Sequence, residues 1–115
     1  MADILTEDFP NKAVFFHPLG YLDKILADEL TMKSRECLSR GIPVIVFALS
    51  GCPIINSFAM AKLIEILDLV AEHNAELWFA DLTHLQEQTF EASGLLPLID
   101  RITNLDDAKR ELGLS

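Results

Sequence analysis

The sequence predicts an α/β fold in which a small mixed sheet of four to five strands has helices packed against it. Short apolar runs bounded by turn residues alternate with longer segments whose apolar residues recur at helical spacing. The run 43–49 is apolar throughout, which is typical of a central strand covered on both faces. Connections are short and no repeat or linker divides the 115 residues. We therefore expect a single domain over residues 1–115, with its core from about 13 to 112.

The first half of the chain predicts a strand and a helix ahead of the central run. Residues 13–19 form a short apolar stretch between turn residues, which favours a strand. Apolar residues at helical spacing predict a helix over 24–40, with Asp23 placed to cap its start and Gly41 to follow its end. Residues 4–9 provide the optional fifth strand.

The middle of the chain predicts a core helix over 57–73 and a strand over 76–80. The strand contains Trp78, which we expect in the core. The expected buried face of the helix consists of apolar residues at core-facing spacing. These residues are Met60, Leu63, Ile64, Leu67, Val70 and Ala71.

The last part of the chain predicts two further helices around a strand. Thr83 and Gln86 have the spacing of a capping box, and the helix that they start ends at Gly94. Residues 98–102 are the expected final strand. A last helix over 104–112 begins at a capping asparagine.

The net charge, the acidic residues near the N-terminus and the shortness of the apolar runs disfavour several classes of protein. A formal net charge of −9 disfavours nucleic acid and anionic membranes as partners. Asp3, Glu7 and Asp8 occupy positions where a secretory signal would be basic and then apolar, and no run is long enough to span a membrane. Cys37 and Cys52 lack the spacing of metal ligands. We expect a cytoplasmic protein with two reduced thiols and no membrane insertion.

The sequence also disfavours catalysis. Ser57 lies at a strand-to-helix turn but outside a Gly-x-Ser-x-Gly pattern, and no glycine-rich phosphate loop follows any strand. His17, His73 and His84 are scattered along the chain, so none is placed to activate a nucleophile. We expect no enzyme activity, no cofactor and no metal.

Four segments in this order resemble a STAS domain, the fold of sulfate-transporter tails and of bacterial anti-sigma-factor antagonists. They are Gly-Tyr-Leu-Asp at 20–23, the central strand at 44–50, Ile-Ile-Asn-Ser-Phe-Ala at 54–59, and Phe-Glu-Ala-Ser-Gly-Leu at 90–95. The resemblance extends from about residue 13 to residue 112.

The resemblance implies a partner-switching function. In such proteins a serine at the start of the second helix is phosphorylated by an anti-sigma factor that is also a kinase, and phosphorylation releases that partner. Ser57 is the matching position. The resemblance implies a partner-binding surface, in which we include Asp23, Asn56, Ser57, Phe58, Lys62 and Glu65.

Two alternatives to the antagonist share the same fold. Asn56, Phe58 and Ala59 differ from the family motif, and a serine followed by a bulky apolar residue is similar to the stressosome branch. In that case the chain would be a scaffold subunit of a stressosome-like complex, and it could form a homo-oligomer. A STAS accessory subunit of an ABC transporter, which binds an ATPase, is the second alternative.

Two residues have a structural interpretation beside the functional one. Ser57 is either a helix N-cap or a site of regulatory phosphorylation. Phe58 falls on a polar stripe with Lys62 and Glu65, away from the core face. It is either an anchor for a partner or a side chain covered by the loop 50–53 or by a neighbouring helix.

Overall fold

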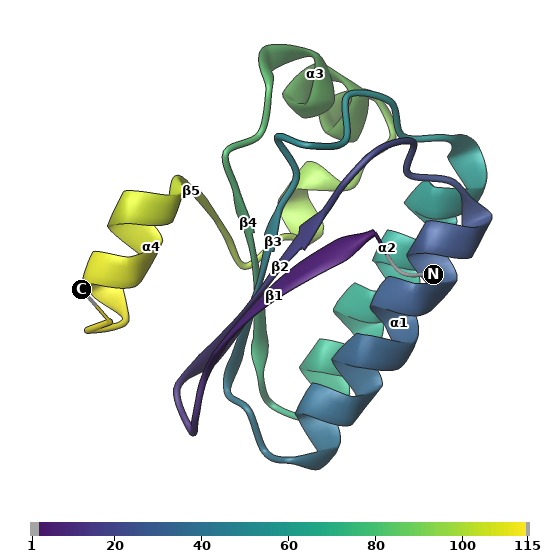
Figure 1. Ribbon diagram of the computed structural model, residues 1–115. Coiled ribbons are helices and arrows are strands. Elements are labelled where there is room, and N and C mark those ends of the chain that lie inside the picture. The colour runs from purple at the N-terminus through teal and green to yellow at the C-terminus, as the bar shows by residue number, and fades with distance from the viewer. Residues whose placement is uncertain (1–2, 115) are drawn as a thin grey trace.

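The computed structural model describes residues 3–114, and in this range strands and helices alternate after an initial strand pair (Figure 1). The strands are β1 (Ile4–Phe9), β2 (Ala13–Pro18), β3 (Val44–Ala48), β4 (Glu76–Ala80) and β5 (Arg101–Thr103). The helices are α1 (Lys24–Ser39), α2 (Ser57–Glu72), α3 (His84–Ala92) and α4 (Leu105–Glu111), with a short 3-10 helix η1 (Leu96–Leu98).

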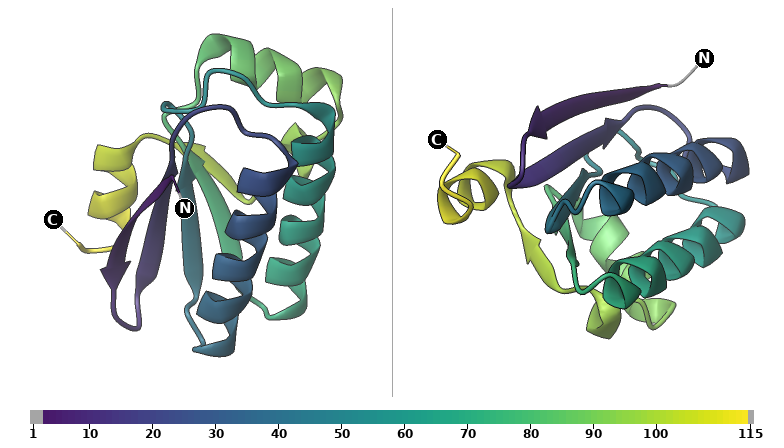
Figure 2. Two further views of the ribbon diagram at one scale, coloured as in Figure 1. Left: turned by 45° about the vertical axis from the view of Figure 1, so that its right-hand side comes forward. Right: turned by 90° about the horizontal axis from the view of Figure 1, so that it is seen from below.

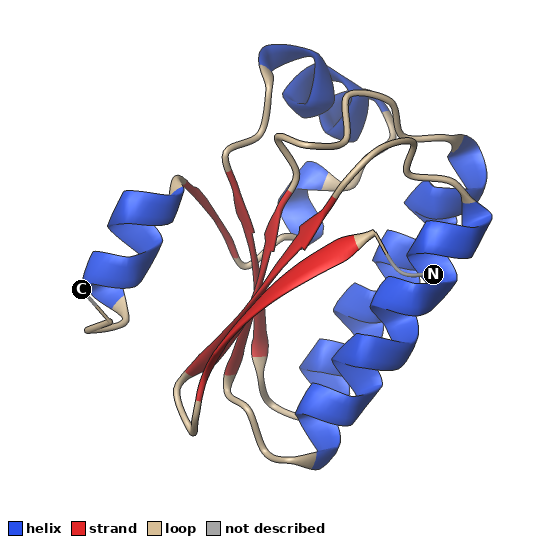
Figure 3. Cartoon of the chain, in the orientation of Figure 1, coloured by secondary structure: helices blue, strands red, loops and turns tan. Residues whose placement is uncertain are grey.

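The strands form one mixed sheet in the order β1-β2-β3-β4-β5. β1 runs antiparallel to β2, and the remaining neighbours are parallel. Helices α1 and α2 cover one face of the sheet and α4 lies on the opposite face (Figure 2). Helix α3 lies at the end of the sheet where the parallel strands terminate (Figure 3). The predicted mixed sheet with packed helices is confirmed, and residues 4–9 supply its fifth strand.

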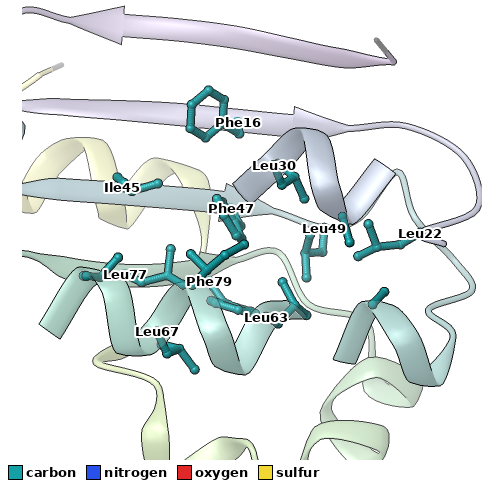
Figure 4. Close-up of a cluster of buried hydrophobic side chains, with 14 of the residues drawn as sticks. Phe16, Leu22, Leu30, Ile45, Phe47, Leu49, Leu63, Leu67, Leu77 and Phe79 are labelled. Atoms are coloured by element: carbon teal, nitrogen blue, oxygen red, sulfur yellow. The ribbon is translucent and has the colours of Figure 1, made fainter. Parts of the chain in front are cut away.

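The central position predicted for residues 43–49 is also confirmed, because all five residues of β3 are buried. Ile45 and Phe47 point to the side of α1 and α2, where they belong to the larger core cluster (Figure 4). Val46 belongs to a smaller cluster on the other face, which includes Ala108 of α4 and Trp78. A strand with apolar residues on both faces is stable only between two such layers.

A row of phenylalanines crosses the sheet on the face of α1 and α2. Phe16, Phe47 and Phe79 are paired in register on three neighbouring strands, with ring centroids 6.1 and 5.8 Å apart. Phe90 of α3 continues the row, edge-on to Phe79 at 5.4 Å. Aromatic pairs at these separations contribute beyond the area that they bury. The row therefore fastens α3 to the sheet.

One sequence prediction about element bounds needs correction. Residues 98–102 do not form a single strand, because Leu98 is still part of the 3-10 turn η1, which contains Pro97, and β5 starts only at Arg101. The carboxylate of Asp100 accepts a hydrogen bond from the amide of Leu77 at 2.8 Å, which supports the edge of β4 just before β5 begins.

The buried face of α2 is rotated from the predicted one. Ile64 is only partly buried and Ala71 is exposed, whereas Ala59 and Ile66 are fully buried. Lys62, one turn before Ile66, pairs with Asp28 of α1 at 3.4 Å. The flank of α2 that carries Lys62 and Ile66 therefore faces α1, which covers it.

Both cysteines are free and buried, as the sequence predicts for reduced thiols. Burial raises the pKa of Cys37 and raises the pKa of Cys52 to about 11, so neither thiol is activated as a nucleophile. Within the described range, 3–114, none of the helices is long and apolar enough to cross a membrane.

Gln86 joins α3 to the loop between β3 and α2. The predicted capping box is present, since Thr83 and Gln86 exchange hydrogen bonds at the start of α3. The side-chain amide of the buried Gln86 also donates to the carbonyls of Leu49 and Cys52, at 2.8 and 2.7 Å. Both hydrogens of the side-chain amide are therefore bonded, and the loop is held in a fixed position relative to α3.

We expect Gln86→Leu to lower the free energy of unfolding by about 2–6 kcal/mol, because two buried carbonyls lose their donor at about 1–3 kcal/mol each. Urea denaturation measures the change. The control is Gln88→Leu on the exposed side of α3, which should change the free energy by less than about 0.5 kcal/mol. Equal stabilities of the two variants would contradict the structural role of Gln86.

Candidate functional site

The segments that lead into α1 and α2 are joined by backbone hydrogen bonds. The amide of Leu22 donates to the carbonyl of Ile54 at 3.0 Å, and the amide of Asn56 donates to the carbonyl of Leu22 at 3.1 Å. This short parallel bridge lies beyond the ends of β2 and β3. It places Asp23 and Asn56, which are far apart in the sequence, at the starts of two neighbouring helices.

Both of these residues cap helices. Asp23 accepts a hydrogen bond from the amide of Leu26 at 3.0 Å, as predicted. Asn56 accepts one from the amide of Ala59 at 2.8 Å and is therefore the N-cap of α2. The interpretation of Ser57 as the N-cap is wrong, because Asn56 already fills that position. Ser57 is the first residue of the helix, and it is exposed.

Phe58 projects from the first turn of α2 and is 65% exposed. Cover by the loop 50–53 or by a neighbouring helix would bury this ring, so the interpretation as a covered side chain is wrong for the chain as described. Lys24, Lys62 and Glu65 lie around Phe58 in one shallow hollow. The structure thus brings together Phe58, Lys62 and Glu65, as their predicted stripe requires.

The charged groups beside Phe58 form a chain of ion pairs between α1 and α2. Asp28 pairs with Lys24 at 2.9 Å and with Lys62 at 3.4 Å, and Lys62 also pairs with Glu65 at 3.2 Å. Hydrogen bonds to Glu65 and then Asp28 raise the pKa of Lys62, and the bond from Lys24 is the main cause that lowers the pKa of Asp28. Lys62 and Glu65 are therefore engaged with each other before any partner binds.

Sequence reasoning missed most of the apolar residues exposed around Phe58. They come from the loops after β2 and β3 and from the first turns of the three longest helices. We call this set the apical surface: Leu19, Tyr21, Ile25, Ile54, Phe58 and Leu85. One sequence feature could have identified two of them. Ile25 and Leu85 are apolar residues in the first turn of a helix that do not fall on its buried face.

The apical surface offers contacts but no assembled catalytic group. The three histidines are engaged elsewhere: His17 with Glu7, His73 with its own helix backbone and His84 with Gln88. Among residues 3–114, no group of three His, Cys, Asp or Glu side chains could hold a metal ion. What the site presents is an apolar surface with a hydroxyl group, which suits binding to a protein.

Solved structures of other proteins have the same fold as this chain. A structure of the Bacillus cell fate determinant SpoIIAA in its phosphorylated form is 15% identical and covers 93% of this chain and 97% of its own, with a TM-score of 0.71. An anti-sigma factor antagonist from Mycobacterium paratuberculosis is 17% identical, covers 96% and 92%, and has a TM-score of 0.77. At such identities the likeness establishes the fold.

A sulfate transporter family protein from Wolinella succinogenes has the same fold, with a TM-score of 0.82 at 15% identity and coverage of 94% of this chain and 90% of its own. No curated protein sequence matches the chain significantly. The family profile described as "STAS domain" matches residues 6–108, which is most of the chain. The chain belongs to the STAS domain family.

Proposed function

We propose that this chain is an anti-sigma-factor antagonist, which binds a kinase-type anti-sigma factor through the apical surface in a partner-switching pathway of transcription regulation. The supporting observation is the pairing of an exposed Phe58 with an exposed Ser57 in the first turn of α2. A large aromatic side chain held at the surface by a rigid helix is a typical anchor for a protein partner. The function is binding in the cytoplasm and not catalysis.

Phosphorylation of Ser57 is the regulatory step of this proposal. The hydroxyl is not required for the helix cap, because Asn56 provides it. A phosphate at the first helical residue would lie beside the unpaired amides and the positive end of the helix dipole. It would also add about two negative charges next to the apolar contact at Phe58, which weakens binding to the partner.

Two other functions use the same surface. The similarity to a sulfate transporter family protein favours a STAS subunit that binds a transporter component, in which case Ser57 would stay unmodified. The Ser57-Phe58 pair favours a scaffold subunit of a stressosome-like complex, which would be a large STAS assembly. Neighbouring genes distinguish a kinase partner from a transporter, and the mass in solution distinguishes a scaffold from a switch.

Phe58→Ala should weaken binding to the partner by at least about tenfold, because it removes the central apolar anchor. The partner is captured from the source organism with the wild-type chain, and affinities are then measured by calorimetry. Met32→Ala is the matched control, because Met32 is 69% exposed on α1, well along from the apical surface. Wild-type affinity for Phe58→Ala would place the interface elsewhere.

Ser57→Asp should weaken the same complex, while Ser57→Ala should bind as the wild-type chain does. Both variants keep the Asn56 cap, so thermal unfolding should leave them close to the wild-type melting temperature. If Ser57→Asp and Ser57→Ala bind equally well, charge at this position has no regulatory effect.

A further inference from the structure

The apical surface contains a second feature besides Phe58, a groove between α3 and the loop that precedes α2. Its volume is about 160 Å³. It is lined by Pro53, Ile54, Ile55, Leu85, Gln86 and Thr89. Ile54 and Leu85 form its walls, although they are 62% and 63% exposed. The groove is therefore an apolar depression whose rims remain in contact with solvent.

Hydrogen bonds fix the walls of this groove relative to each other. Gln86, at its floor, bonds the carbonyls of Leu49 and Cys52 on the loop side. The thiol of Cys52 donates to the carbonyl of Pro18 at 3.2 Å. At Gly51 an added Cβ would lie 2.6 Å from the side chain of Leu19, so this loop packs closely on its neighbour. A preformed groove of this kind binds with little loss of conformational entropy.

The helix that lines the groove carries charge of one sign. α3 contains the exposed carboxylates Glu87 and Glu91 and no lysine or arginine. The chain as a whole has a formal net charge of −9. The lysines on the other side, Lys24 and Lys62, are already paired with Asp28 and Glu65. An approaching partner thus meets a negative potential that favours basic segments.

We propose that the groove between α3 and residues 53–55 binds a basic segment of the partner protein, which inserts one large apolar side chain between Ile54 and Leu85. The apolar walls accept the side chain, and lysines or arginines beside it are attracted to Glu87 and Glu91 of α3 and to the net negative charge of the chain. This inference rests on the proposed function, because it defines which part of the partner contacts the apical surface. It adds α3 to an interface that the sequence placed at the start of α1 and on α2.

Photo-crosslinking in cells of the source organism tests the groove directly. The full chain carries p-benzoylphenylalanine at position 85, 58 or 32 in three separate strains, and the crosslinked peptides are identified by mass spectrometry. Position 32 is the control because it is exposed but lies outside the apical surface. We expect positions 85 and 58 to crosslink to one partner, with a peptide of net positive charge that contains a large apolar residue at position 85, and no such adduct at position 32.

The outcomes separate the groove from the proposed function. An adduct at position 58 without one at position 85 would overturn the groove and leave the proposed function standing. A neutral or acidic peptide, or a second copy of this chain, at position 85 would also overturn the groove. Absence of a partner at both positions would overturn both proposals. As a second variant, Leu85→Ala should lower the affinity for the partner that is crosslinked at position 58 at least fivefold. A wild-type affinity would contradict the proposed groove.

Discussion

The phenylalanine row and the Gln86 side chain together hold the apical surface in place. Phe79 on β4 packs against Phe90, which fixes α3 above the end of the sheet. Gln86 then connects α3 to the loop after β3 through two buried hydrogen bonds. Because α2 begins at the end of that loop, the position of Ser57 depends on both contacts. The aromatic packing thus sets where the surface hydroxyl lies.

Hydrogen bonds at the starts of α1 and α2 explain why apolar side chains stay exposed at this end. The loops before α1 and α2 bond to each other through Leu22, and both helix starts are capped by their own side chains. Backbone polar groups are therefore satisfied without burying Ile54 or Phe58. A rigid backbone that presents apolar residues to solvent is suited to binding a partner with little rearrangement.

The fold was largely predictable from the sequence, because β3 is apolar on both faces and the caps at Asp23, Thr83 and Asn104 have local signatures. Residues 98–102 were harder to predict. Pro97 belongs to a 3-10 turn, and Asp100 contacts β4, which is distant in the sequence. The site was predicted only in part. Local patterns identify Phe58, but Leu85 joins the surface through contacts between segments more than 30 residues apart, which periodicity does not reveal.

The most direct test of partner switching is intact-mass measurement of the chain, purified with its partner and incubated with ATP. The account predicts a single added phosphate, located on Ser57 by fragmentation, and release of a kinase-type anti-sigma factor as the phosphate appears. An unmodified chain that stays bound to a transporter ATPase or to a large STAS assembly would contradict it. In that case the exposed serine and phenylalanine would belong to a permanent interface.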